Sequence, residues 1–219
     1  MNIIDQWLES KKSGLAVLLL GAALLTLAGC QTTQNVRNTG HTFHTVIVDA
    51  GHGGHDAGTR SSRYILEKDA ALDIALKVDS KLRAAGLKTV LTRKGDYFVT
   101  LDDRVRISNR EENAIFVSIH LNEARPKPGI HGVETYYTSS QSVDLARGIL
   151  SRVGAVSGET PHGMHVAHFH VLRLNVNPAV LVECGYLSNK AEGQRFANPA
   201  YRDTVATAIA QAIVAQKSK

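Results

Sequence analysis

The sequence has few cysteines, few aromatic residues and no strong charge bias. Two cysteines among 219 residues exclude a disulfide-rich scaffold. Aromatic residues make up 5 % and charged residues 21 % of the chain, while 43 % is hydrophobic, which is typical of one globular domain with a real core. The excess of 25 Lys and Arg over 20 Asp and Glu is small and spread along the chain. We therefore expect no nucleic-acid partner.

A hydrophobic run long enough to span a bilayer is also lacking. Residues 15–28 form an apolar run of 14 residues, whereas a transmembrane helix needs roughly 20. A run of this length after Lys11 and Lys12 is typical of a secretory signal. The segment 27–30 (LAGC) resembles a bacterial lipobox. The sequence thus predicts a lipoprotein signal peptide over residues 1–29 and lipidation of Cys30.

A lipidated Cys30 implies attachment to a membrane. Two or three acyl chains anchor a protein far more firmly than one. Residue 31 is Gln and not Asp. By analogy with Gram-negative lipoproteins, this favours attachment to the outer membrane, facing the periplasm. A signal anchor with an incidental cysteine is the competing interpretation. The polar stretch up to residue 42 predicts a tether, so we expect the globular domain over residues 43–217.

The rest of the chain alternates predicted strands with predicted helices. Short β-branched or apolar runs indicate strands, and apolar residues at helical spacing indicate helices. The expected strands are 44–49, 87–92, 115–119, 133–137 and 179–183. The expected helices are 66–85, with Gly86 as its C-terminal cap, 101–112, 143–153 and 201–215. This alternation predicts a single α/β domain whose sheet is covered by helices.

Four side chains capable of metal binding or proton transfer stand at the ends of these elements. They are His52 in a glycine-rich loop after the first strand, Glu67 at the start of the first helix, His120 after the third strand and Glu183 at the end of the last strand. The carboxyl ends of strands are where α/β sheets bind ligands. The sequence therefore predicts a site at this edge of the sheet.

Two imidazoles and one carboxylate are the ligand set of a catalytic zinc ion. A second carboxylate can accept a proton from water and pass it to a leaving amine, so these residue types suffice for amide hydrolysis. Residue types and positions leave open whether Glu67 or Glu183 is the metal ligand. They also leave open structural roles, with Glu67 as a favourable acid in a first helical turn and His120 as a hydrogen-bonded residue at a strand end.

Six motifs in a fixed order carry a family resemblance. They are VDAGHGG (48–54), EKD (67–69), LTR (91–93), LDDR (101–104), FVSIH (116–120) and VECGYLSN (182–189). Together they closely resemble the zinc-dependent N-acetylmuramoyl-L-alanine amidases of the amidase-3 family over residues 45–215. The resemblance implies a phosphorylase/hydrolase-like α/β fold with a central mixed sheet. It also implies hydrolysis of the amide between N-acetylmuramic acid and L-alanine in peptidoglycan.

The resemblance assigns roles to the candidate residues. It implies one catalytic Zn²⁺ held by His52, Glu67 and His120, with Glu183 as the catalytic carboxylate. Asn122 is a candidate substrate-binding residue beside the metal. Its two neighbours are larger than is common in the family, so we expect a different substrate fit there.

The segment between the fourth and last strands is short. Members of the family devoted to cell division resemble this chain but carry a long insertion there, with a helix that blocks the zinc. Residues 138–170 span only 33 positions, which leaves little room for such a helix. We therefore expect an open cleft that requires no activator protein.

A histidine cluster and the second cysteine allow other interpretations. Four histidines in a nine-residue window suggest either a second metal site or, as we favour, a substrate-facing loop: His162, His165, His168 and His170. Cys184 could be proposed as a nucleophile, because lipoprotein wall peptidases of the Cys/His type exist, but adjacent strand residues point to opposite faces. If Glu183 faces the cleft, Cys184 is a buried thiol.

The predicted protein is a lipid-anchored zinc amidase that remodels or degrades peptidoglycan. Two alternatives within enzymes are a zinc peptidase that cuts inside the stem peptide and an amidase restricted to released muropeptides. A non-catalytic peptidoglycan-binding lipoprotein is the alternative from another class, disfavoured because all four chemical residues are present.

Overall fold

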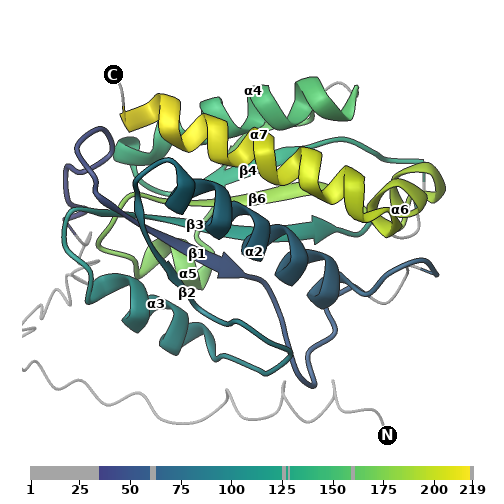
Figure 1. Cartoon of the computed structure of the whole chain (residues 1–219), viewed down its shortest axis with the longest axis horizontal. Helices are drawn as coiled ribbons and strands as arrows, with labels where there is room; N and C mark the ends of the chain where they lie inside the picture. The colour runs from purple at the N-terminus through teal and green to yellow at the C-terminus, as the bar shows by residue number, and fades with distance from the viewer. Residues whose placement is uncertain (1–34, 60–62, 125–126, 128, 159–160, 218–219) are drawn as a thin grey trace, which may run out of the picture. The chain divides into compact units, whose positions relative to one another are not determined.

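A mixed six-stranded sheet forms the centre of the fold (Figure 1). The computed structural model describes residues 35–59, 63–124, 127, 129–158 and 161–217, all within the unit Gln34–Lys219. The strands are β1 (Thr45–Ala50), β2 (Lys88–Leu91), β3 (Ala114–Asn122), β4 (Glu134–Tyr137), β5 (Gly163–Val166) and β6 (Ala179–Tyr186). The helices are α2 (Glu67–Ala84), α3 (Leu101–Asn109), the 3-10 turn η2 (Ser140–Ser142), α4 (Val143–Ser157), α5 (His170–Arg173), α6 (Lys190–Ala197) and α7 (Pro199–Lys217).

The strand order across the sheet is β2-β1-β3-β6-β4-β5. Strands β2, β1, β3 and β6 are parallel to their neighbours in this group, β4 runs antiparallel to β6, and β5 is parallel to β4. The predicted single α/β domain with a central mixed sheet is confirmed.

Alternating strand residues divide the core between the two faces of the sheet. On β1, Val46 and Val48 pack with the long helices α2, α4 and α7, while Ile47 between them packs with α3 and α5. Figure 1 shows α2, α7 and α4 side by side across one face. The opposite face carries helices of only nine and four residues. Less of that face is covered, which leaves room for polar side chains at the strand ends.

The same alternation places the candidate site on the less covered face. His120 and Asn122 share the face of Phe116 on β3, and Glu183 faces the same side from β6. We predicted that β3 and β6 end at residues 119 and 183, but both continue for three more residues. Backbone pairing carries the ladder past the apolar runs, so His120 and Glu183 lie opposite each other within paired strands.

The helix that begins with Glu67 ends as predicted. Gly86 follows it with φ of 81°, a conformation that costs glycine little. The Gly86 N–H donates to the Arg83 carbonyl and the Leu87 N–H to the Leu82 carbonyl, each at 3.0 Å. These two bonds form a Schellman motif, which satisfies carbonyls at the end of α2.

Four elements are missing from the prediction: β5, α5, α6 and the three-residue 3-10 turn η2. β5 is a four-residue edge strand and α5 is a single turn, so each is too short to show a hydrophobic period. α6 is mostly polar and starts at Asn189, whose side chain caps it by accepting the Ala191 and Glu192 N–H groups.

The predicted signal peptide (1–29) and Cys30 lie outside the described residues. Part of the predicted tether is described and lies against the domain. Arg37 donates to the Glu111 carbonyl at 2.7 Å, and Thr39 donates to the Ala114 carbonyl at 2.7 Å. None of the helices in the described part of the chain combines the length and hydropathy that a membrane crossing requires.

Candidate active site

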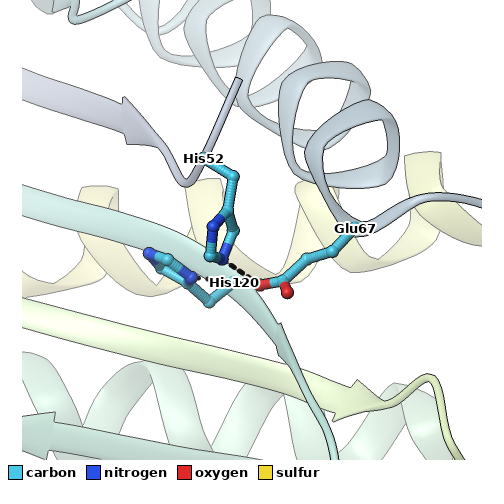
Figure 2. A group of neighbouring side chains, drawn as sticks. All are labelled: His52, Glu67 and His120. Carbon is cyan, nitrogen blue, oxygen red and sulfur yellow. Dashed lines mark hydrogen bonds and ion pairs between the residues drawn. The ribbon is translucent and has the colours of Figure 1, made fainter. Parts of the chain in front are cut away.

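Three of the predicted site residues converge at the carboxyl end of the sheet. Figure 2 shows His52, Glu67 and His120 pointing toward one another from the loop after β1, the start of α2 and the end of β3. Glu67 Oε1 lies 3.0 Å from His52 Nε2 and 3.1 Å from His120 Nδ1. The three potential ligand atoms all lie within 4.8 Å of one another. This geometry and donor set suit a divalent metal ion.

The loop that carries His52 has an unusual backbone. His52 has φ of 58°, a left-handed conformation that costs a residue with a side chain on the order of 1 kcal/mol. Gly51 precedes it, and a Cβ built there would lie 2.4 Å from the His120 ring. The glycine therefore allows the loop to pass directly over the second imidazole.

Two buried arginines hold this loop by its carbonyl groups. Arg93 donates to the carbonyls of Ala50 at 3.1 Å and Gly51 at 2.7 Å. Arg104 donates to the carbonyls of Ala50 at 2.6 Å and His52 at 2.7 Å. Three successive carbonyls thus have charged donors, which fixes the position of His52 despite its strained backbone.

A buried carboxylate completes this support. Asp49, at the end of β1, accepts bonds from Arg104 at 2.5 Å, Thr92 at 2.6 Å and Ser118 at 2.7 Å. Burial alone would raise the pKa of Asp49, but the Arg104 charge and these hydrogen bonds bring the pKa below its usual value. Asp49 is therefore charged and neutralises Arg104 inside the domain.

Glu67 is positioned by backbone groups as well as by the histidines. Its Oε2 accepts the Thr59 N–H at 2.7 Å, and its Oε1 accepts the Leu121 N–H at 3.1 Å. A Cβ at Gly58 would lie 2.4 Å from Glu67 Oε2, so only glycine allows this approach. Burial raises the pKa of Glu67, but hydrogen bonds from His120 and His52 outweigh it and lower the pKa strongly. The carboxylate is ionised, as a metal ligand must be.

Asp56 orients His52 from the other side of the ring. Its Oδ2 lies 2.8 Å from His52 Nδ1, so Nδ1 donates to the carboxylate and Nε2 faces Glu67. Burial lowers the pKa of His52, but the bonds and charges of Glu67 and Asp56 raise it overall. The sequence reasoning missed Asp56, whose signal was an acid four residues after a candidate ligand.

Glu183 is the fourth predicted residue at the site. It lies opposite His120 in the β3–β6 pair, and its Oε2 is buried with no hydrogen-bond partner among the described residues. Burial and the charges of Glu67 and Glu134 raise its pKa well above the usual value. A carboxyl group in this state favours holding a proton, which suits acid–base chemistry.

Glu134 lies opposite Glu183 on β4 and was not singled out from the sequence. Its Oε2 accepts bonds from Tyr136 and Tyr186, each at 3.0 Å, and from Asn122 Nδ2 at 2.8 Å. Asn122, the predicted substrate-binding residue, is thus held by Glu134 beside the site. Its proposed contact with substrate stays a prediction.

The histidine-rich segment is more ordered than the loop we predicted. Residues 163–166 form β5 beside β4, and His170 begins α5, where its Nε2 lies 2.6 Å from Asp102 of α3. His165 stacks on Tyr136 with ring centroids 5.3 Å apart. The metal-ligand grouping found among the described residues is the triad, and the four histidines take no part in it. Cys184 is fully buried in the core, as predicted.

Comparison with known proteins gives one family for this arrangement. The Amidase_3 family model, described as N-acetylmuramoyl-L-alanine amidase, matches residues 46–215. The amidase LytC of Bacillus subtilis is 35 % identical over 169 residues, which cover 75 % of this chain and 34 % of LytC. The chain therefore spans about a third of the length of that relative.

Solved structures show the same fold. The amidase AmiC2 of Nostoc punctiforme superposes with a TM-score of 0.76 at 37 % identity, covering 80 % of this chain and 97 % of that one. The CwlD amidase of Clostridioides difficile, solved in complex with the GerS lipoprotein, gives a TM-score of 0.74 at 29 % identity, covering 80 % and 98 %. A family model and structural matches that each cover 80 % of this chain thus agree with the geometry.

Proposed function

The chain belongs to the Amidase_3 family of N-acetylmuramoyl-L-alanine amidases, and we propose on this premise that it hydrolyses the amide between N-acetylmuramic acid and L-alanine in peptidoglycan. The observation that carries the proposal is the convergence of two imidazoles and an ionised carboxylate beside a second, proton-holding carboxylate. Metal-assisted amide hydrolysis uses a Lewis acid and a proton carrier, and the site contains residues that would hold the first and supply the second.

The donor set fits Zn²⁺. His52, Glu67 and His120 would hold the ion, with Asp56 and the backbone N–H groups of Thr59 and Leu121 as the supporting shell. When bound, it would polarise the scissile carbonyl and stabilise the negative charge that develops there.

Glu183 is the proposed proton carrier. Its buried Oε2 lacks a hydrogen-bond partner among the described residues, so this oxygen is free to accept a proton from the attacking water. The raised pKa makes Glu183 a stronger base for this step, and the protonated carboxyl then passes its proton to the amine that leaves as the amino group of L-alanine. Glu67 cannot serve in this way because its hydrogen bonds hold it ionised.

Digestion of purified sacculi by the full chain, with and without a chelator, tests the proposal. We expect intact stem peptides with a free L-alanine amino group and sugar without peptide, and we expect the chelator to stop their release. Mass spectrometry separates the alternatives, because a zinc peptidase would leave L-alanine on the sugar. Products from muropeptides alone would indicate an amidase restricted to released fragments.

We also propose that the protein is a lipoprotein held at the outer membrane and facing the periplasm. The lipobox at residues 27–30, the preceding apolar run and Gln31 support this. The short polar tether would keep the domain near the wall polymer that it cuts.

The cleft is proposed to be active without an activator protein. The long helix of the segment 138–170, α4, packs on α7 and against β4 and β6. The described residues of this segment place no long helix over the triad. Inactivity of the full chain on sacculi until a partner is supplied would contradict this part of the proposal.

A further inference from the structure

A cavity beside the triad has no role in the chemistry described so far. It has a volume of about 400 Å³, within the range of small-molecule sites, and is lined by His52 and His120 but not by Glu67 or Glu183. The segment before α3 and the start of α5 form its walls. The cavity therefore opens beside the two imidazoles, next to the place where the scissile bond must lie.

Exposed apolar side chains surround the cavity. Phe98 is 41 %, Leu101 53 % and Phe169 44 % exposed, and they come from segments about 70 residues apart. The Phe169 ring also contacts the Tyr136 ring, and the two ring centroids lie 5.1 Å apart. Exposed aromatic rings gathered at a concave site next to catalytic groups indicate a surface that binds a ligand.

Most polar side chains that line the cavity already have hydrogen-bond partners within the protein. Asp56 bonds to His52, His170 bonds to Asp102, and Asp49 bonds to Arg104. Among the described residues of the lining, Arg104 is the one side chain with a fixed positive charge, and it is nearly fully buried. The cavity thus offers apolar contact and no exposed fixed cation to pair with a carboxylate.

These charges favour the sugar part of the proposed substrate over its peptide part in the cavity. The stem peptide carries carboxylates, and Asp56 at the cavity would repel them. The muramyl sugar is uncharged once its lactyl group is in the amide, and its ring and acetamido methyl present apolar faces to aromatic rings. On the other side of Glu183, the same face carries His165, whose Nε2 lies 3.6 Å from Glu134 Oε1.

We propose that the cavity between the start of α3 and α5 binds the muramyl sugar, with Phe98 and Phe169 as the residues that set this specificity. The proposal rests on the amidase function and adds the direction in which the substrate crosses the site. The sugar occupies the α3–α5 side, and the stem peptide extends toward β4 and β5.

Two substrates with the same scissile amide test the proposal in the zinc-loaded full chain. One is N-acetylmuramyl-L-alanyl-D-isoglutamine, and the other is D-lactyl-L-alanyl-D-isoglutamine, which lacks the sugar. We expect Phe98→Ala and Phe169→Ala to lower kcat/KM for the first about tenfold, equivalent to about 1.4 kcal/mol, and to leave the second unchanged. Leu76→Ala is the matched control, because Leu76 is 38 % exposed on α2.

Equal losses on both substrates, or no loss on either, would overturn the sugar assignment. If the wild-type chain cleaves neither substrate, the proposed function is wrong. An NMR titration with the sugar alone then still tests whether the cavity binds it. The methyl β-glycoside of N-acetylmuramic acid with its lactyl carboxyl converted to the neutral amide should then give saturable NMR shifts at the cavity that Phe98→Ala abolishes. Absence of such shifts in the wild-type chain would refute the site itself.

Discussion

Replacing Glu183 with glutamine should have opposite effects on activity and stability. The substitution keeps the shape of the side chain but removes its ability to accept a proton. A positioned acid–base group contributes roughly 10²- to 10⁴-fold to rate, so turnover should fall by about that factor, or about 3–5 kcal/mol. Zinc should remain bound, because Glu183 is not among the converging ligand atoms.

The stability gain follows from the same burial. A buried polar group without a hydrogen bond costs about 1–3 kcal/mol, and more when it is charged. Glu183 Oε2 is in this position, and the negative charges of Glu67 and Glu134 add to the cost of ionising it. Removing the charge should raise the Tm of the metal-free protein at pH 7 by about 2–4 °C per kcal/mol.

The sign of the pH dependence provides a second check. The folded-state pKa of Glu183 is raised, so below the unfolded value of 4.5 the carboxyl group is protonated in both states and has no effect. Above that pH the unfolded chain ionises more readily than the folded one. The stability of the wild type should therefore fall, relative to Glu183→Gln, as pH rises from about 4.5, and the two should coincide near pH 4.

Calorimetry, metal analysis and turnover on muropeptide substrate measure these three effects. Glu112→Gln is the matched control, since Glu112 is an exposed carboxylate on the loop before β3 and should change none of them. Glu67→Gln should instead weaken zinc binding. If Glu183→Gln loses zinc while Glu67→Gln retains it, the two roles are exchanged and the mechanism is wrong.

Three further predictions concern the metal and the anchor. Asp56→Asn should weaken zinc binding about 10- to 100-fold, measured by competition with a chromogenic chelator, because the ring of His52 loses its charged partner, whereas Asp144→Asn on α4 should have no effect. Zinc affinity should fall as pH drops through the raised pKa of His52, because the metal must displace its proton, and calorimetry in two buffers should detect the proton released; a pH-independent affinity would contradict this. Cys30→Ser should leave an unprocessed or mislocalised precursor, and a mutant that is cleaved at the same site and stays membrane-bound in high salt would refute lipidation.

The fold was predictable wherever local pattern dominates. The helix beginning at Glu67 has apolar residues at helical spacing and a glycine after its last turn, and the apolar run 115–119 predicts a buried strand. The strand ends were wrong because β3 and β6 extend each other through backbone pairing, which leaves no mark on either sequence. Short edge elements such as β5 were not predicted, because four residues are too few to show a hydrophobic period.

The site was predictable in its residues but not in its support. His52, Glu67 and His120 could be named from motifs, yet the reason they meet is non-local. Arg93 and Arg104 belong to two of the same motifs, and the sequence offers no sign that they donate to successive carbonyls of one loop.

This support explains how a small domain can keep an open metal site rigid. His52 stands in a strained left-handed conformation, and a loop held only by neutral hydrogen bonds would relax it. Charged donors from the loop after β2 and from α3 are roughly twice as strong as neutral ones, and Asp49 neutralises Arg104. The cost of burying this charge network is offset because every carbonyl of the loop from Ala50 to His52 gains a charged partner. The buried arginines are thus the groups that hold His52 in its strained conformation.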